Sequence, residues 1–129
     1  IPEIKLHRIN GEPFNIGKTK FIPVQVMHNK LHIWGYRIGG FTYITDAPFI
    51  PPAEKEKIKG SDILVLNALR REKHISHFTL EEAIITAQEL NAKQVYFTHI
   101  SHQLGKHTEV EKELPPGMHL AYDGLVLDV

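Results

Sequence analysis

Three short apolar segments each lead directly into a side chain that can bind a metal ion. The segments and the residues that follow them are 21–27 and His28, 41–45 and Asp46, and 94–98 and His99. Each segment reads as a buried strand that delivers one imidazole or carboxylate to a common rim, which is how a rigid metal site is built. Nitrogen and oxygen would have to hold the ion, because the chain has nine histidines and no cysteine. The pattern therefore predicts that these three side chains lie within a few ångströms of one another.

Each of the three residues also has a simpler structural interpretation. His28 precedes Asn29 and Lys30, so it could be a rim histidine that bonds a backbone carbonyl. Asp46 stands before Ala47 and a proline, where an ordinary turn aspartate is common. One carboxylate can, however, bridge two divalent ions about 3.5–4 Å apart. We expect Asp46 to be that bridge, with His28 and His99 as the terminal ligands.

Two further histidines are candidates for roles beside the metal ligands. His102 lies three residues after His99, and we expect it either to support a metal ligand through a hydrogen bond or to contact the substrate. His77 immediately precedes Phe78 and a helix start, where its near-neutral pKa would suit protonation of an alkoxide leaving group. It could instead be a surface histidine. His74 is the competing candidate for the same role.

The composition limits the function classes. The 129 residues could form one small domain, and 42% of them are apolar, which is enough for a core. Fifteen acidic and fifteen basic side chains cancel and are scattered, so a groove for long nucleic acid is not favoured. No apolar run approaches the length of a membrane helix, and we expect a cytoplasmic protein.

Alternating apolar and polar residues, together with turn-forming residues, predict strands at both ends of the chain and a strand-helix-strand unit in its second half. The expected strands are 4–9, 14–17, 21–27, 31–38, 41–45, 62–67, 93–98, 119–122 and 125–129. Helices are expected at 53–59, 79–90 and 109–114. Of these, the helix that begins at Thr79 has the clearest signal, because Thr79 and Glu82 have the spacing of a capping box. The whole pattern indicates an α/β or α+β layer arrangement.

The ligand residues and their neighbours resemble the C-terminal half of a metallo-β-lactamase-fold hydrolase. The resemblance covers nearly the whole chain and is strongest to the branch of cyclic-phosphate phosphodiesterases of phosphonate breakdown, with the tRNA 3′-processing endonucleases more distant. The motifs that carry it include Tyr43 to Ala47, His77 to Thr79, Thr98 to His102, Leu114 to Gly117 and Ala121 to Gly124.

This resemblance implies a fold, a cofactor and a set of roles. Residues 1–129 would form one α/β half-domain of a four-layer αββα sandwich, with a mostly antiparallel or mixed sheet and flanking helices. Two zinc or manganese ions would lie between the halves, with His28 completing one site, His99 the other and Asp46 bridging them. A bridging hydroxide would attack phosphorus in line, while His77 would act as general acid or orient the phosphate.

One departure from the family pattern affects what the chain can do alone. The first ligand motif of the family, His-x-His-x-Asp-His, supplies most ligands from the N-terminal half and occurs nowhere in these residues. We therefore expect this chain to be a fragment that binds metal weakly and is inactive unless it associates with the missing half. Exposed strand edges could also pair two copies of the chain by dimerisation or strand exchange.

Three functions remain open at the level of sequence. The first is hydrolysis of a small or cyclic phosphate ester, which suits the ligand set, His77 and the zero net charge. The second is tRNA processing by the same chemistry, which would need a basic exosite or arm. The third is a β-rich binding or assembly module in which the histidines are incidental.

Overall fold

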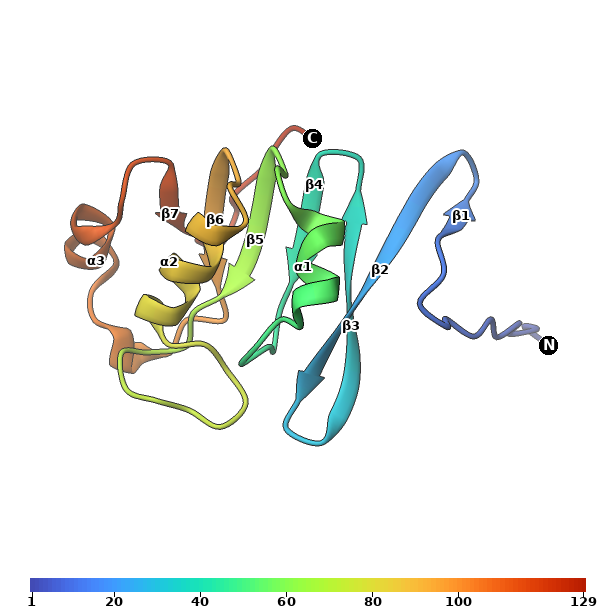
Figure 1. The fold of residues 1–129 in the computed structure, drawn as a ribbon, viewed down its shortest axis with the longest axis horizontal. Helices are drawn as coiled ribbons and strands as arrows, with labels where there is room; N and C mark the ends of the chain where they lie inside the picture. The colour runs from blue at the N-terminus through green and yellow to red at the C-terminus, as the bar shows by residue number, and fades with distance from the viewer.

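The computed structural model describes residues 1–129 and contains one sheet, three α-helices and one 3-10 turn (Figure 1). The strands are β1 (Phe14–Ile16), β2 (Thr19–His28), β3 (Leu31–Ile38), β4 (Phe41–Ile44), β5 (Ile63–Asn67), β6 (Gln94–Thr98) and β7 (Met118–Leu120). The helical elements are α1 (Pro52–Ile58), α2 (Leu80–Glu89), the 3-10 turn η1 (His102–Leu104) and α3 (His107–Glu113). The α/β fold class and the mixed sheet expected from the sequence are confirmed.

The seven strands lie side by side in chain order. Strands β1 to β4 are antiparallel to their neighbours, and β4 to β7 are parallel. Each parallel pair needs a crossover, and the three crossovers contain α1, α2 and α3 in turn. Because such crossovers are right-handed and the strand order always advances in the same direction, the helices must lie on one face of the sheet. Figure 1 shows α1 and α2 on that face and α3 beside β7.

The helix-covered face contains the hydrophobic core. Alternate strand residues such as Val24, Ile44, Leu66 and Phe97 are fully buried there and pack with apolar side chains of the helices. The capping box of α2 forms as the sequence predicts, with the Thr79 side chain accepting from the Glu82 amide. This cap fixes the start of α2, and so fixes the position of the residues immediately before it.

The opposite face of the sheet carries no helix. A row of cross-strand partners runs across it, and these residues are Tyr36, Tyr43, Val65, Tyr96 and His119. Tyr43 is 43% exposed even though it lies in a strand with neighbours on both sides. A sheet with helices on one face is half of the expected four-layer sandwich. That residues 1–129 are one half-domain of a longer protein remains a proposal.

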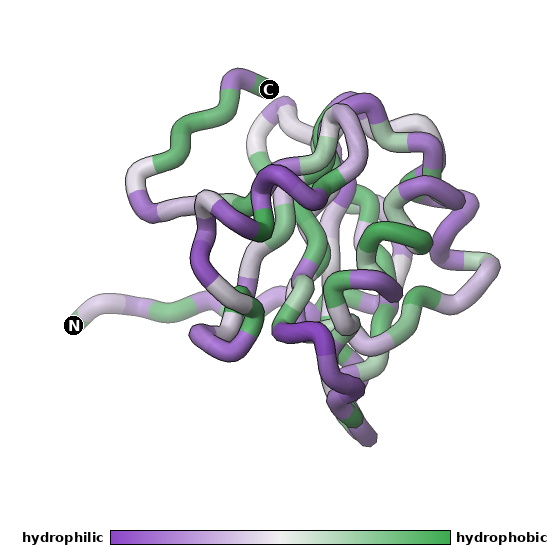
Figure 2. The backbone as a smooth tube through the Cα atoms, turned by 90° about the vertical axis from the view of Figure 1, so that its left-hand side faces the viewer, coloured by the Kyte–Doolittle hydropathy of each residue, from purple (hydrophilic) through white to green (hydrophobic).

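Two strand predictions are wrong. Residues 4–9 alternate in polarity but have no neighbouring strand, and nearly all are exposed. Residues 125–129 do not return as a hairpin, because β7 pairs only with β6 and the chain turns at the Leu125 amide to Tyr122 carbonyl bond. Figure 2 shows both chain ends on the side of the sheet away from the helices. No helix has the length and apolar composition needed to cross a membrane.

Candidate metal centre

The topology brings the predicted ligands to one edge of the sheet. Strands β4, β5 and β6 are parallel, and β2 runs in the same direction because two antiparallel pairings separate it from β4. The carboxyl ends of all four strands therefore meet at the lower edge in Figure 1. His28 ends β2, while Asp46 and His99 follow β4 and β6 within two residues. The loop after β5 brings His77 to the same edge.

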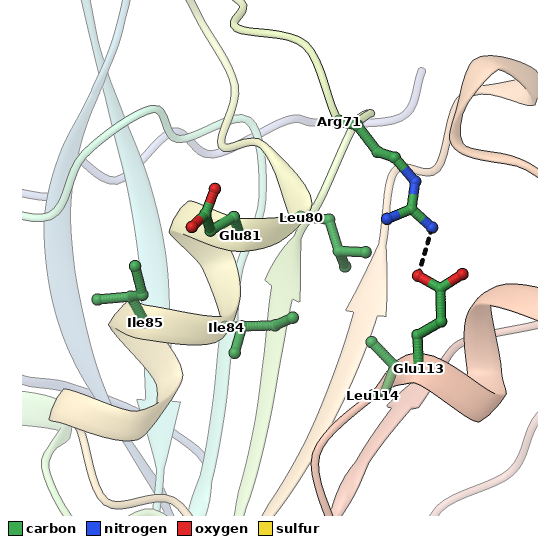
Figure 3. A pocket seen from close by; sticks show the side chains of 7 residues that line it. All are labelled: Arg71, Leu80, Glu81, Ile84, Ile85, Glu113 and Leu114. Carbon is green, nitrogen blue, oxygen red and sulfur yellow. Dashed lines mark hydrogen bonds and ion pairs between the residues drawn. The ribbon is translucent and has the colours of Figure 1, made fainter.

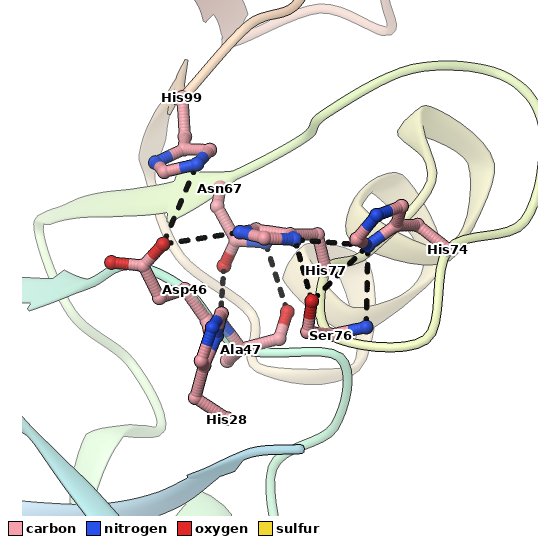
Figure 4. A network of polar contacts seen from close by, with 8 residues as sticks. All are labelled: His28, Asp46, Ala47, Asn67, His74, Ser76, His77 and His99. Carbon is pink, nitrogen blue, oxygen red and sulfur yellow. Dashed lines mark hydrogen bonds and ion pairs between the residues drawn. The ribbon is translucent and has the colours of Figure 1, made fainter. Parts of the chain in front are cut away.

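These four residues form what we call the strand-end cluster (Figure 4). The Oδ1 atom of Asp46 lies 3.1 Å from His77 Nε2 and 3.4 Å from His99 Nε2. One ligand atom from each of His28, Asp46 and His77 also lies within 4.8 Å of the others. The rings of His77 and His99 are stacked with centroids 4.6 Å apart. The structure thus brings together all three predicted ligands and the predicted catalytic histidine.

His28 is oriented by its own neighbour in the cluster. Its Nδ1 atom lies 3.0 Å from the backbone carbonyl oxygen of Asp46. A carbonyl can only accept, so Nδ1 must carry the proton, and Nε2 is left with its lone pair free. Donation of one ring N–H to a carbonyl is the usual way in which a metal-binding histidine is fixed. The bonded carbonyl and the ligand role are compatible, and the donor set of imidazole nitrogen and carboxylate oxygen fits a zinc-like or manganese-like ion.

The backbone of the cluster adopts a conformation that ordinary residues avoid. Asp46 has φ of 57° and His99 has φ of 58°. The left-handed region costs a residue with a side chain about 1–2 kcal/mol. Aspartate, asparagine and histidine enter this region more often than other types with a side chain. The other two such residues are Asn29 and Asn91, and Asn91 follows the end of α2 in the way expected of a helix cap. Positive φ at two strand ends on the same edge of the sheet is typical of a functional site.

Asn67 braces the Asp46 turn, and sequence reasoning missed it. This side chain is fully buried at the end of β5. Its Oδ1 accepts from the Ala47 amide at 3.0 Å, and its Nδ2 donates to the Ala47 carbonyl at 2.9 Å. The same carbonyl accepts from the Phe78 amide at 2.9 Å, so Ala47 links the Asp46 turn to the residue after His77. An asparagine that ends a long apolar run was the available signal.

His77 is the most enclosed histidine of the cluster, with 8% of its surface exposed. Burial lowers the pKa of His77, and the nearby His99 and His74 lower it further, while the hydrogen bond to Asp46 acts in the opposite direction. The ring is therefore biased toward its neutral form. On its other side His77 contacts His74 and Ser76 through Nδ1. His74, the competing candidate, contacts His77 rather than Asp46.

His102 is not brought into the strand-end cluster. It is exposed at the start of η1 and makes no hydrogen bond to a cluster residue. Its predicted role as a substrate contact stays a prediction. A cavity of about 310 Å³ does open beside His99, and its lining includes Ile100, Tyr122 and Asp123. This cavity provides space for a small ligand next to the cluster.

A second group of histidines lies beside β7, and we call it the β7 cluster. His119 Nδ1 is 2.8 Å from Glu111 Oε1, and the other oxygen of Glu111 accepts from the Leu120 amide at 2.8 Å. Burial acts to raise the pKa of Glu111, but the bonds from Leu120 and His119, together with the charge of His107, lower it overall. Both carboxylate oxygens already have protein partners. The β7 cluster is therefore a structural pair of Glu111 and His119.

A groove between α2 and α3 is separate from the candidate centre (Figure 3). It has a volume of about 440 Å³, and its walls include Leu80, Ile84 and Leu114. Arg71 Nη2 pairs with Glu113 Oε2 at 2.6 Å across its rim. No strand-end residue lines it, so the size of this groove does not make it the catalytic site.

Comparisons with known proteins are consistent with this geometry. A family model described as "Beta-lactamase superfamily domain" matches residues 2–100. A crystal structure of a diphosphatase from the PhnP family is 46% identical in sequence and has a TM-score of 0.93. The match covers 97% of this chain and 49% of the diphosphatase chain. The human tRNase Z short form is 16% identical with a TM-score of 0.69, covering 89% of this chain and 45% of that one, which is a likeness of fold alone.

A second relative carries a different name and is much longer than this chain. An octanoyltransferase from Porphyromonas gingivalis (strain ATCC BAA-308 / W83) is 36% identical over 126 residues, which are 96% of this chain and 26% of that protein. The chain thus spans about half the length of the two solved structures and about a quarter of the curated relative.

Proposed function

Because the chain belongs to the beta-lactamase superfamily, we propose that it forms part of a metal-dependent hydrolase that cleaves a phosphate ester or diphosphate bond. The single observation that carries this proposal is the convergence of His77 and His99 on one carboxylate oxygen of Asp46. Imidazole nitrogens and a carboxylate oxygen brought together where strands end are features of a metal centre rather than of a core.

In this proposal the strand-end cluster supplies part of a two-metal site. His28 and His99 would each complete one ion, and Asp46 would bridge the two. When bound, zinc or manganese ions lower the pKa of a water molecule and stabilise negative charge on the leaving oxygen. Zinc normally takes three or four protein ligands. We therefore propose that the remaining ligands come from sequence outside these residues, since the diphosphatase is about twice as long.

His77 is assigned the proton-transfer role. Its Nε2 atom points at Asp46 and so at the centre of the cluster. A nearly buried imidazole held at this point can donate a proton to an oxygen that leaves phosphorus, or can hold a phosphate oxygen in line. His102 is proposed only as an outer contact for the substrate, because it is exposed and lies on the segment that follows His99.

A small substrate is favoured over a long nucleic acid. The cavity beside His99 has a volume of about 310 Å³, which suits a compact phosphate ester. The chain has no net charge, whereas tracking of a phosphate backbone needs clustered lysine and arginine. The name of the diphosphatase relative supports a diphosphate as the class of substrate.

The test uses the full-length protein and a panel of four substrates. We expect hydrolysis of bis-p-nitrophenyl phosphate and faster hydrolysis of a cyclic ribose phosphate or a nucleoside diphosphate ester, with loss of activity after EDTA treatment and recovery on addition of Zn²⁺ or Mn²⁺. A short RNA should be cleaved slowly or not at all. Faster cleavage of the RNA would point to nucleic-acid processing instead.

Two histidine variants connect that activity to the cluster. His28→Ala should lower both metal content, measured by plasma mass spectrometry, and turnover. His32→Ala is the matched control, because His32 lies four residues further along the same hairpin, is exposed, and bonds only Gln25. A wild-type protein that binds no metal and hydrolyses none of the four substrates would leave the binding-module interpretation in place of the hydrolase.

A further inference from the structure

A second cavity lies beside the one that opens at His99, and Tyr122 lines both of them. We call the first the His99 cavity and the second the β7 cavity. The β7 cavity has a volume of about 290 Å³, and its lining comes from β6, α3, β7 and the turn after β7. Four rings contribute to this lining, those of Tyr96, His107, His119 and Tyr122. The proposed metal chemistry uses none of these rings.

The four rings are arranged in two pairs with faces left open. The Tyr96 and His119 rings are tilted by 32°, with centroids 5.4 Å apart. The His107 and Tyr122 rings meet edge to face, with centroids 6.2 Å apart. Tyr122 is 60% exposed, so this contact leaves most of its ring uncovered. The β7 cavity therefore offers aromatic faces to a ligand.

Backbone bonds hold Tyr122 where the two cavities meet. The Ala121 amide, immediately before it, donates to the Phe97 carbonyl at 2.7 Å. The Leu125 amide donates to the Tyr122 carbonyl at 3.1 Å and closes a four-residue turn. Gly124 has φ of 88°, as the third residue of a type II turn requires. The Tyr122 ring is thus presented from a fixed backbone.

A flat neutral ring fits the β7 cavity better than a cationic head group does. Aromatic faces also attract cations, but a buried cation needs a carboxylate as well. Both oxygens of Glu111, the carboxylate in this lining, are already bonded to His119 and to the Leu120 amide. A nucleobase needs only the ring faces, because every base has a π-face on which an aromatic side chain can stack.

We propose that the two cavities bind the nucleoside part of a nucleoside phosphate substrate, with Asp123 bonding ribose hydroxyls and Tyr122 stacking against the base. This inference deepens the proposed function and rests on it for the position of the phosphate at the metal centre. Asp123 lines the His99 cavity and is exposed there. Carboxylates are the groups with which many proteins bind ribose hydroxyls. The order from His99 through Asp123 to the rings matches the order of phosphate, ribose and base.

Three substrates with one leaving group test this subsite in the full-length protein. They are the p-nitrophenyl esters of adenosine 5′-phosphate, ribose 5-phosphate and methyl phosphate. We expect KM for the adenosine ester to be about 10-fold or more below that for the ribose ester, the effect of one base stack. KM for the methyl ester should be higher still. Similar kcat values are expected, because contacts remote from phosphorus bind substrate and transition state alike. Equal KM values for all three esters would overturn the proposal.

Variants assign the two contacts. Tyr122→Ala should raise KM for the adenosine ester by about 10- to 100-fold and change KM for the other two by less than about twofold. Tyr122→Phe keeps the ring and should recover most of the loss. Asp123→Ala should raise KM for the adenosine and ribose esters by about 10-fold, with little effect on the methyl ester. Asp128→Ala, which removes another exposed aspartate near the end of the chain, is the control and should change no KM.

A readout that does not depend on turnover comes from saturation-transfer NMR. Adenosine 5′-monophosphate added to the full-length protein in EDTA should receive saturation at the adenine H2 and H8 protons. This transfer should disappear in Tyr122→Ala and persist in Tyr122→Phe. Phosphocholine, a probe with a cationic head group, should give no transfer that depends on Tyr122. Binding of phosphocholine without binding of the nucleotide would show that the assignment of a base is wrong.

The two measurements separate this inference from the function on which it rests. If the wild type hydrolyses none of the three esters but the adenine signal depends on Tyr122, the proposed function fails and the nucleoside subsite stands. If the esters are hydrolysed and Tyr122→Ala raises every KM equally, the function stands and the subsite is wrong. The comparison of adenosine and ribose esters in the wild type decides the matter without any variant, so poor folding of Tyr122→Ala would not leave it open.

Discussion

Two groups of histidines lie at different edges of one sheet, and they differ in what their carboxylate does. In the strand-end cluster one oxygen of Asp46 faces two imidazole nitrogens, and no backbone amide bonds its side chain. In the β7 cluster both oxygens of Glu111 are occupied, one by His119 and one by the Leu120 amide. The first carboxylate can accept a cation without loss of a bond to the backbone. The second cannot.

The backbones of the two groups differ in the same sense. Asp46 and His99 are held with positive φ, whereas Glu111 lies in a regular helix and His119 in a strand. The buried Asn67 bonds the backbone of Ala47 and so holds the turn at Asp46. The number of histidines in a group is therefore a poor guide to a metal centre. A better guide is whether their nitrogen atoms and a carboxylate oxygen lie close together on backbone that is held in place by other hydrogen bonds.

The largest expected effect comes from exchange of the two carboxylates for amides. Asp46→Asn removes the negative charge shared by His77 and His99, and we expect turnover to fall by about 10³-fold, in the range of a lost charged contact at a reacting centre. Glu111→Gln should leave turnover within about twofold of the wild type. Steady-state kinetics and metal analysis of both variants measure the contrast. Equal losses would make the two regions functionally alike.

The second largest effect is expected for loss of the Asn67 side chain, which holds the turn at Asp46. Asn67→Ala leaves the amide and carbonyl of Ala47 without their side-chain partner in a buried site, and we expect a loss of about 2–4 kcal/mol in the free energy of unfolding. Asn67→Asp keeps the acceptor for the Ala47 amide but faces a second oxygen toward the carbonyl, so it should also be destabilising. Urea denaturation followed by circular dichroism measures both. A change below about 0.5 kcal/mol for Asn67→Ala would mean that the turn holds itself.

Glu111→Gln should have a smaller effect on stability than Asn67→Ala. The amide oxygen of glutamine can still accept from Leu120, but the charge that strengthens the bonds to Leu120 and His119 is lost. We expect a loss of about 1 kcal/mol. The same urea experiment measures it, with Glu109→Gln, an exposed position in the same helix, as the control. A loss as large as that of Asn67→Ala would show that the β7 cluster also braces the core.

Acid should weaken the two regions in separate pH windows. The pKa of His77 is lowered in the folded chain, so between that value and the ordinary 6.5 the unfolded chain binds more protons and stability falls as pH falls below about 6.5. The lowered pKa of Glu111 contributes stability above its ordinary 4.5, and that contribution is lost as pH falls through the folded value. Unfolding midpoints measured in EDTA from pH 8 to pH 3 should show both steps.

Two variants assign the steps. His77→Gln should remove the step that begins below about pH 6.5 and retain the one that begins below about pH 4.5, and Glu111→Gln should do the reverse. A wild-type profile that is flat between pH 7 and pH 5 would contradict the direction assigned to His77.

The parts of the site that the sequence predicts are those in which a strand end and a ligand type coincide. His28, Asp46 and His99 each follow an apolar run, and parallel strand order then brings them together without further information. His77 was identified by its place before the Thr79 cap. The roles of these residues in metal binding and proton transfer are still predictions. Asn67 was missed because its importance depends on a bond to Ala47, which is distant in sequence and visible only in the fold.

The failures have a common physical cause. Residues 4–9 and 125–129 have strand-like patterns, but a strand exists only where another backbone accepts its hydrogen bonds, and polarity does not report a partner. The contact between His74 and His77 was equally hidden, because side chains three apart in a loop meet only for particular backbone angles. The sequence pattern thus identified the strand ends at which the candidate site lies. The contacts between side chains there depend on the backbone conformation of the loops, which the pattern does not report.

The order of the strands has a consequence for how the protein is made. Since every strand pairs with its neighbour in sequence, the sheet can be extended one strand at a time as the ribosome releases the nascent chain. His99 emerges 53 residues after Asp46, a delay of about 3–10 s at ordinary translation rates. A nascent chain that stops before β6 would expose one side of β5 and lack its last imidazole. In the proposed two-metal site, the ion that His99 completes could therefore be bound only after β6 has joined the sheet.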